Sequence, residues 1–202
     1  MALNGLAFLF SVFGLSYAET KFVCDEFLHI EPASLRVVKN EYLSMPLRYE
    51  APEKLRKSLE KELGHSLLNR GEAHVTILTP QEFSTISKRL TNNEIEKIAE
   101  LFARGDLTIK PRCIGKGEAI LDGKAEQTYY VVVEVPALLK IRQAIQAAFN
   151  SKKPKNNDAK GGTPSEFQAE NYHPHVTLGF TKRDLYESDG VIKNLASCIY
   201  EL

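Results

Sequence analysis

The sequence has no net charge, no paired-cysteine motif, no Asn-x-Ser/Thr glycosylation site and no second long apolar run. Lys and Arg total 26, and Asp and Glu also total 26, so the formal net charge is zero. Proteins that coat nucleic acid are usually basic. Neutrality therefore argues against a broad duplex-binding surface and fits a small nucleotide held in a pocket, while leaving room for a local basic patch.

Cysteine is also scarce, with only Cys24, Cys113 and Cys198 in the chain. The absence of Cys-x-x-Cys makes a structural zinc site an unfavoured interpretation. Outside the cell, an odd number of cysteines implies one bridge and a free thiol, or an intermolecular bond. All three pairings are open, and Cys24 with Cys198 is favoured because domain termini often lie close together.

Residues 1–18 are predicted to be a secretory signal. Leu6 to Leu15 forms an apolar core, and Ser16-Tyr17-Ala18 offers small residues at the two positions that matter for cleavage. No Lys or Arg precedes the core, so an N-terminal anchor or a buried strand is the alternative, although the run is short for a transmembrane helix. We expect cleavage after Ala18, secretion, no stable membrane association, and a domain spanning residues 19–202.

Hydrophobic periodicity and breaker residues predict alternating strands and helices. Residues 107–121 are expected to be a strand broken near Gly115 and Gly117, with a hairpin turn at Asp122-Gly123 leading into 127–135. The segment 129–133 is apolar on both faces, which indicates a central strand. The other expected strands are 35–43, 73–79, 174–181 and 195–201, and the expected helices are 52–63, 80–88, a helix capped by Thr91 and Glu94 that ends at Gly105, and one starting at Pro136.

Residues 151–165 contain no hydrophobic side chain beyond one alanine. This composition predicts a mobile surface loop. The loop precedes the second motif described below and could cover a cleft or supply lysines to a phosphate, but a plain solvated insertion is the simpler interpretation.

Two short stretches share the tripeptide His-Val-Thr and lie roughly a hundred positions apart. The first is His74, Val75 and Thr76, and the second is His175 to Thr177, each followed by apolar residues. Such residues favour strands, in which successive side chains point to opposite faces. Each strand therefore offers an imidazole and a hydroxyl on one face and an apolar side to a core, and two such strands side by side would bring both pairs to one cleft.

These groups suit the cleavage of a phosphodiester. One proton must leave the attacking hydroxyl or water and another must reach the departing oxygen, and histidine can do either near neutral pH. The hydroxyls of Thr76 and Thr177 would donate hydrogen bonds to non-bridging oxygens as negative charge develops. The chemistry requires no metal, and the sequence does not say which histidine is the acid.

The two stretches with their flanks, Arg70 to Pro80 and His173 to Phe180, resemble the signature of the 2H phosphoesterase superfamily, and most closely its Swiss army knife branch. The resemblance spans roughly residues 35–200. It implies an α+β, bilobal, pseudo-twofold symmetric fold in which two antiparallel sheets form a central cleft with helices packed outside. It also implies a metal-independent phosphodiesterase with catalytic His74 and His175 and phosphate-binding Thr76 and Thr177. The implied substrates are 2′,5′-linked oligonucleotides, 2′,3′-cyclic phosphates or related cyclic nucleotides.

Three tyrosines are candidates for stacking on a base or contacting a ribose. Tyr172 lies beside the second motif, and Tyr129 and Tyr130 lie on the expected central strand. For each of them, a place in the core or at its rim is the simpler interpretation.

The remaining histidines and the basic pair after the second motif have simpler interpretations than a functional one. His173 could help a zinc site with His175 and His74, but His173-Pro174 could equally set the turn into the strand. His29 and His65 are expected at the surface. Lys182-Arg183 could reach a phosphate, although a solvated strand end is favoured.

The sequence therefore predicts a secreted, monomeric phosphodiesterase that needs no cofactor or protein partner and acts on a small nucleotide or short oligonucleotide. Two alternatives stay open. One is a non-catalytic secreted nucleotide-binding module, and the other is a zinc-dependent hydrolase.

Overall fold

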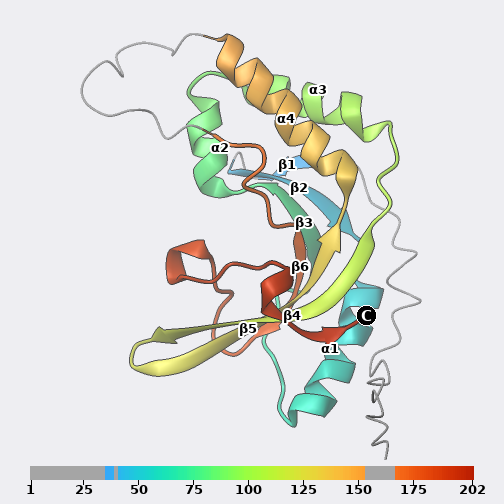
Figure 1. Ribbon diagram of the computed structural model, residues 1–202, viewed down its shortest axis with the longest axis vertical. Coiled ribbons are helices and arrows are strands. Elements are labelled where there is room, and N and C mark those ends of the chain that lie inside the picture. The colour runs from blue at the N-terminus through green and yellow to red at the C-terminus, as the bar shows by residue number, and fades with distance from the viewer. Residues whose placement is uncertain (1–34, 39–40, 153–166) are drawn as a thin grey trace, which may run out of the picture.

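The computed structural model describes residues 35–38, 41–152 and 167–202 (Figure 1). The predicted signal sequence at 1–18 lies outside this part of the chain, as do Cys24 and His29. The predicted loop 151–165 also lies outside it, apart from its first two residues. No helix of the described part is long and apolar enough to span a membrane.

The first sheet has three antiparallel strands in the order β1-β2-β3. They are β1 (Arg36–Val38), β2 (Tyr42–Leu47) and β3 (Ala73–Leu78). The prediction of one strand over 35–43 is wrong, because the chain reverses after Val38, and the N–H of Glu41 donates to the Val38 carbonyl at 2.9 Å. The second strand then continues to Leu47 because its alternate residues enter the core.

The second sheet has four antiparallel strands in the order β6-β5-β4-β7. They are β4 (Lys110–Leu121), β5 (Lys124–Glu134), β6 (His175–Phe180) and β7 (Cys198–Glu201). The interior position of β5 confirms the central strand predicted from its two apolar faces. Asp122-Gly123 forms the turn between β4 and β5, as predicted, with both residues at positive φ.

The predicted break in β4 is wrong, because the strand runs through both glycines. A Cβ at Gly115 would lie 2.4 Å from the Tyr130 ring, and one at Gly117 would lie 2.3 Å from Val191. Glycine is therefore needed at these two positions for close approach of neighbouring side chains and does not end the strand.

Within the described residues, four α-helices flank the sheets: α1 (Glu50–Leu63), α2 (Pro80–Ser87), α3 (Asn92–Ala103) and α4 (Pro136–Ser151). α1 begins two residues before the predicted start at Pro52. α2 and α3 each begin with a reciprocal capping box, Thr79 with Glu82 and, as predicted, Thr91 with Glu94.

The chain contains an internal repeat, and the helix of each half packs against the motif strand of the other half. In each half, a strand, a helix and a motif strand follow one another, β2-α1-β3 and β5-α4-β6, and the two strands pair antiparallel. α1 packs against β6 of the second sheet, whereas α4 packs against β3 of the first and runs beside α3 (Figure 1). The α+β architecture with two antiparallel sheets and outer helices confirms the predicted fold class.

A direct backbone link joins the two halves. Leu68, just ahead of β3, and Phe180, the last residue of β6, exchange two N–H···O hydrogen bonds of 2.9 Å. This approach depends on Gly179, where a Cβ would lie 2.8 Å from the Leu67 Cβ and 2.9 Å from the Leu68 carbonyl oxygen. The glycine of the second motif stretch thus allows the segment ahead of β3 to lie directly against the end of β6.

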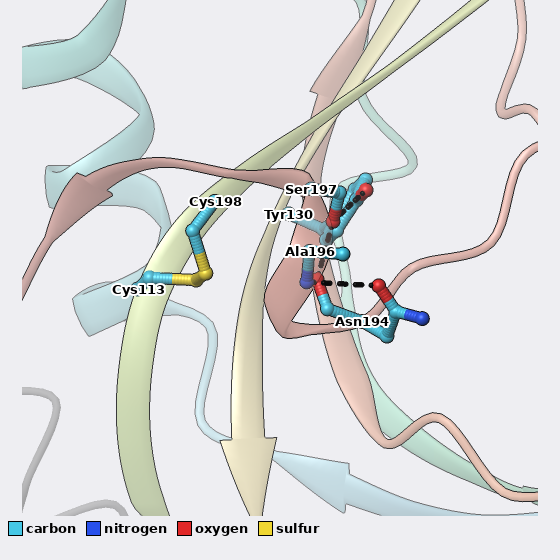
Figure 2. The surroundings of a disulfide bond; sticks show 6 residues. All are labelled: Cys113, Tyr130, Asn194, Ala196, Ser197 and Cys198. Carbon is cyan, nitrogen blue, oxygen red and sulfur yellow. Dashed lines mark hydrogen bonds between the residues drawn. A yellow bond between two sulfur atoms is a disulfide. The ribbon is translucent and has the colours of Figure 1, made fainter.

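Cys198 forms a disulfide with Cys113, so the favoured pairing of Cys24 with Cys198 is wrong (Figure 2). β4 and β7 are antiparallel neighbours, and this pairing brings the Cα atoms of the two cysteines to 5.7 Å, a normal distance for a disulfide. Closeness of the domain ends was a weaker guide than strand pairing, which the sequence did not reveal.

Candidate active site

All four motif residues, His74, Thr76, His175 and Thr177, line a single cavity of about 340 Å³. The intervening Val75 and Val176 are fully buried behind them. The alternation of strand faces therefore places the imidazoles and hydroxyls as the sequence predicted.

The cavity exists because each motif strand lies at one edge of its sheet. β3 ends the order β1-β2-β3, β6 begins the order β6-β5-β4-β7, and the two strands contact each other. The two edges meet beside the link between Leu68 and Phe180, and the side chains on one face of each strand converge.

His175 is held in a defined orientation. Its Nδ1 lies 2.8 Å from the backbone carbonyl of His173, which can only accept, so Nδ1–H donates and the neutral ring keeps its lone pair on Nε2. The Tyr130 ring and the imidazole pack in an edge-to-face arrangement, with 5.7 Å between ring centroids. Burial lowers the pKa of His175, and the charge of Lys193 lowers it further.

His74 has the opposite kind of neighbour. Its Nδ1 lies 3.7 Å from a carboxylate oxygen of Glu72, and its ring is 5.8 Å from that of Tyr42. Burial lowers the pKa of His74 as well, but the Glu72 carboxylate works against this shift, while Arg70 reinforces it. Of the two imidazoles, His74 is the one whose protonated form has a carboxylate beside it.

The two threonines are not equivalent. Within the described part of the chain, the Thr76 hydroxyl has no hydrogen-bond partner and is available to a ligand in the cavity. The Thr177 hydroxyl donates its one hydrogen to Asp184 Oδ2 at 3.1 Å. In this structure, therefore, only the threonine of the first motif is placed as the sequence-based mechanism requires.

Asp184 is the centre of a buried polar cluster behind the second motif. Oδ1 accepts hydrogen bonds from Lys193 Nζ and Thr128 Oγ1, both at 2.7 Å, and Oδ2 lies 3.5 Å from Arg70 Nη2. Burial alone would raise the pKa of Asp184, but the charge and hydrogen bonds of Lys193 and Thr128 bring it below its ordinary value. Asp184 is thus an anion at neutral pH with two cations beside it.

Sequence reasoning missed Arg70, Asp184 and Lys193, all of which line the cavity. Arg70 lies in the flank of the first motif and could have been singled out there, and its guanidinium also donates to the Tyr186 hydroxyl. Asp184 and Lys193 belong to no pattern in the sequence.

Of the three candidate tyrosines, the structure places only Tyr172 on the cavity wall. The hydroxyls of Tyr129 and Tyr130 donate to Gln127 and Ser197, respectively, and both rings are buried in the sheet. Their predicted contact with a base or ribose is therefore not supported, and the simpler interpretation as core residues holds.

Arg142 of α4 holds the wall around Tyr172. The guanidinium carbon lies 4.7 Å from the Tyr172 ring centroid, and the group forms two hydrogen bonds with the Glu82 carboxylate, at 2.7 and 3.0 Å. It also donates to the carbonyl of Ile77 and to three carbonyls between Gln168 and Asn171. One buried side chain thereby fixes the end of β3, the start of α2 and the segment leading to β6.

The other sequence candidates are accounted for by ordinary contacts. His65 is exposed, as predicted, and His173 lines the cavity while its carbonyl orients His175. Lys182 binds Asp122 and Arg183 binds Asp189, away from the cavity lining. Among residues 35–38, 41–152 and 167–202, no group of three or more His, Cys, Asp or Glu side chains is placed to hold a metal ion.

The cavity is lined by two histidines, one from an edge strand of each antiparallel sheet. This arrangement is the one expected of a phosphoesterase with two His-x-Thr motifs. A comparison with protein families assigns the chain within that class. Residues 41–186 match the family described as Swiss Army Knife, 2H phosphoesterase domain, and the chain belongs to this family. Membership supports a phosphodiesterase-type function and confirms the resemblance seen in the two motifs.

Searches of curated proteins and of solved structures each found no match.

Proposed function

We propose that the protein is a metal-independent phosphodiesterase that hydrolyses RNA-like nucleotide phosphodiesters by general acid–base catalysis with His74 and His175. The observation that carries this proposal is the convergence of both imidazoles on one cavity. A cavity of about 340 Å³ falls in the ordinary size range of small-ligand sites. This size suits a mononucleotide or a short oligonucleotide end.

The surroundings of the two histidines support a division of roles. His175 Nε2 carries the lone pair because Nδ1–H donates to the His173 carbonyl, and burial and nearby Lys193 disfavour its protonation. This nitrogen removes the proton from the attacking water or ribose hydroxyl as the new O–P bond forms. His74, whose imidazolium is favoured by Glu72, gives its proton to the leaving oxygen as the old P–O bond breaks. The Thr76 hydroxyl donates to a non-bridging oxygen in the transition state.

A nearby ribose hydroxyl is a ready nucleophile or leaving group in 2′,5′-linked oligonucleotides, 2′,3′-cyclic phosphates and related cyclic nucleotides, and these are the proposed substrates. Incubation with a 2′,5′-linked dinucleotide and with 2′,3′-cyclic AMP, each with and without chelator, tests the proposal. Turnover that chelator does not affect is expected. Binding without turnover would indicate the nucleotide-binding module, and loss of turnover with chelator would indicate the zinc hydrolase.

Substitution of either histidine provides the second test. We expect His74→Ala and His175→Ala each to lower kcat by roughly 10²–10⁴-fold, because each removes one proton-transfer group. His65→Ala, which changes an exposed histidine beyond α1, is the matched control and should keep the wild-type rate. A near-normal rate in either motif variant, with the fold intact by circular dichroism, would refute the assignment.

We also infer that the chain is secreted after cleavage of residues 1–18. The Cys113–Cys198 disulfide supports this, because disulfides persist mainly in oxidising compartments. On expression with its native N-terminus, protein in the medium should begin at Glu19 by mass spectrometry. Retention in the cell with residues 1–18 intact would contradict the inference.

A further inference from the structure

The second motif has a buried ammonium beside it that the two-histidine scheme does not use. Lys193 is 4% exposed and Asp184 5% exposed, yet both line the cavity. Lys193 Nζ lies 2.7 Å from Asp184 Oδ1 and 3.5 Å from Thr177 Oγ1. Burying a charged pair is costly, so its position against a cavity wall calls for an explanation.

Hydrogen-bond accounting shows which group on this side can donate to an anion. The Thr177 hydroxyl has one hydrogen, and that hydrogen goes to Asp184. An ammonium has three N–H donors, of which Asp184 and Thr177 accept two. Lys193 therefore keeps a donor that a phosphate oxygen in the cavity could accept, whereas Thr177 does not.

The charges around Asp184 also favour an anion as the ligand on this side of the cavity. The single negative charge of Asp184 faces two cations, Lys193 at 2.7 Å and Arg70 at 3.5 Å. One positive charge in this cluster is left over, and the phosphate of a nucleotide diester carries one negative charge. A buried cation in a partly desolvated cavity stabilises such an anion more strongly than a neutral hydroxyl does.

The segment that carries Lys193 is fixed at several points. Val191 packs against Gly117, the Ser197 hydroxyl accepts a hydrogen bond from Tyr130 at 2.7 Å, and Cys198 is covalently bound to β4 (Figure 2). The Tyr130 and Tyr186 rings flank the ammonium, with centroids 5.3 and 5.7 Å from Nζ. Lys193 is thus held in place before any ligand binds.

We propose that Lys193 is the phosphate-contacting residue of the second half of the site, in the place that the motif pattern gives to Thr177, and that Asp184 is the positioning residue that holds both. The proposal rests on the proposed function, since it takes the bound anion to be a phosphodiester. Lys193 lies beyond residue 186, the last residue of the family match, so the match does not assign it this role.

Two lysine substitutions make the central test. Lys193→Met should lower kcat/KM for 2′,3′-cyclic AMP by roughly 10²–10³-fold, as expected when one donor to the transition-state charge is removed. It should also weaken binding of inorganic phosphate by at least about tenfold in isothermal titration calorimetry. Lys182→Met is the matched control, because it removes the same charge from a half-exposed lysine bound to Asp122. It should leave both quantities unchanged.

A second pair of variants separates the role of Lys193 from folding and from Thr177. Lys193→Met leaves the Asp184 charge buried, and if that variant unfolds, Asp184→Asn combined with Lys193→Met removes both charges. The double variant should fold and still bind phosphate weakly. Thr177→Val should lower kcat/KM by less than Lys193→Met does, and the reverse order would overturn the proposal.

The two proposals fail in different ways. If the wild-type protein turns over 2′,3′-cyclic AMP and Lys193→Met does so equally well, the role of Lys193 is refuted and the phosphodiesterase stands. If the wild-type protein shows no turnover but binds inorganic phosphate more tightly than the Lys193→Met variant does, the catalytic function is refuted and the anion site stands. If the wild type does not bind inorganic phosphate at all, the role of Lys193 is refuted.

Discussion

Burial lowers the pKa of both imidazoles of the site, and the strongest nearby charge acts in opposite directions on the two. The charge of Lys193 lowers the pKa of His175 further, whereas the Glu72 carboxylate offsets part of the effect of burial on the pKa of His74. Burial lowers both pKa values because it removes water from the charged form of each ring. The strongest charge beside His175 is a cation, and the strongest beside His74 is a carboxylate.

The lowered pKa values of both histidines predict that kcat/KM is highest at acidic pH. A lowered pKa means that the proton is lost at lower pH, so both limbs of the kcat/KM profile, which report the free enzyme, should lie below the ordinary histidine pKa of about 6.5. We expect a bell-shaped profile with its maximum below about pH 6.5. Steady-state rates at constant ionic strength provide the measurement.

The variant Glu72→Gln tests whether the Glu72 carboxylate sets the pKa of His74. Loss of the carboxylate should lower the pKa of His74 further, so the alkaline limb, which reports the acid, should move to lower pH while the acid limb stays in place. A maximum above neutrality, or movement of the acid limb alone, would contradict the assigned roles.

At this scale, the sequence predicted what depends on strand alternation and missed what depends on distant contacts. His74 and Thr76 share a face because side chains alternate between the two faces of a strand, and this alternation can be predicted from the local sequence. The engagement of Thr177 by Asp184 depends on how the chain returns after β6, and Lys193 arrives from a segment without regular pattern. No local signal specifies either contact.

Among the elements, α4 does more than cover the first sheet, because its buried Arg142 binds parts of three other segments. Glu82, which caps α2, shares its carboxylate between Arg142 and the N–H of Thr79. The segment entering β6 has three carbonyls bound by the same guanidinium. The two motif strands are thus positioned partly by a residue from outside both motifs.

Arg142→Met should lower the free energy of unfolding by about 3–5 kcal/mol, because it leaves the Glu82 carboxylate and four carbonyls without their donor. Arg142→Lys should recover little of this, since one ammonium cannot replace the planar fork of donors. Urea denaturation provides the measurement. Arg112→Met, at a half-exposed pair with Glu134, is the control and should cost about 1 kcal/mol or less. A loss for Arg142→Met as small as that of the control would refute the bracing role.

Helix starts were predicted to within two residues because their signals, a proline in the first turn or the Thr91–Glu94 capping box, are local, whereas two strand assignments failed for non-local reasons. The reversal after Val38 is set by the pairing of β1 with β2, and an apolar run of this kind reads equally well as one strand. The glycines of β4 read as breakers, but their reason is the proximity of Tyr130 and Val191, which only the folded chain shows. The exchange of α1 and α4 between the sheets has no sequence signal.

The molecule as a whole is closed by a covalent bond between strands far apart in the sequence. Cys113 and Cys198 are 85 positions apart, and the bond places β7 beside β4 at the end of the described chain. A bridge that closes so long a loop restricts the unfolded chain strongly.

Replacing both cysteines with alanine should lower the free energy of unfolding by about 4–5 kcal/mol on the chain-entropy account. Chemical denaturation of the oxidised protein and of the variant should show the difference. Reductant should destabilise the wild type by a similar amount and leave the double variant unchanged. Equal stability of the oxidised wild type and the variant would show that the bond adds nothing.

The paired backbone bonds between Leu68 and Phe180 also limit how the molecule can work. They fasten the strands that carry the two histidines at one end, beside a glycine that admits no side chain. The two halves cannot separate at this end without breaking those bonds, so the link restrains how far the edges of β3 and β6 can move apart. If the protein has the proposed function, we expect it to select ligands by their fit to a cleft whose width at this end is determined by the fold.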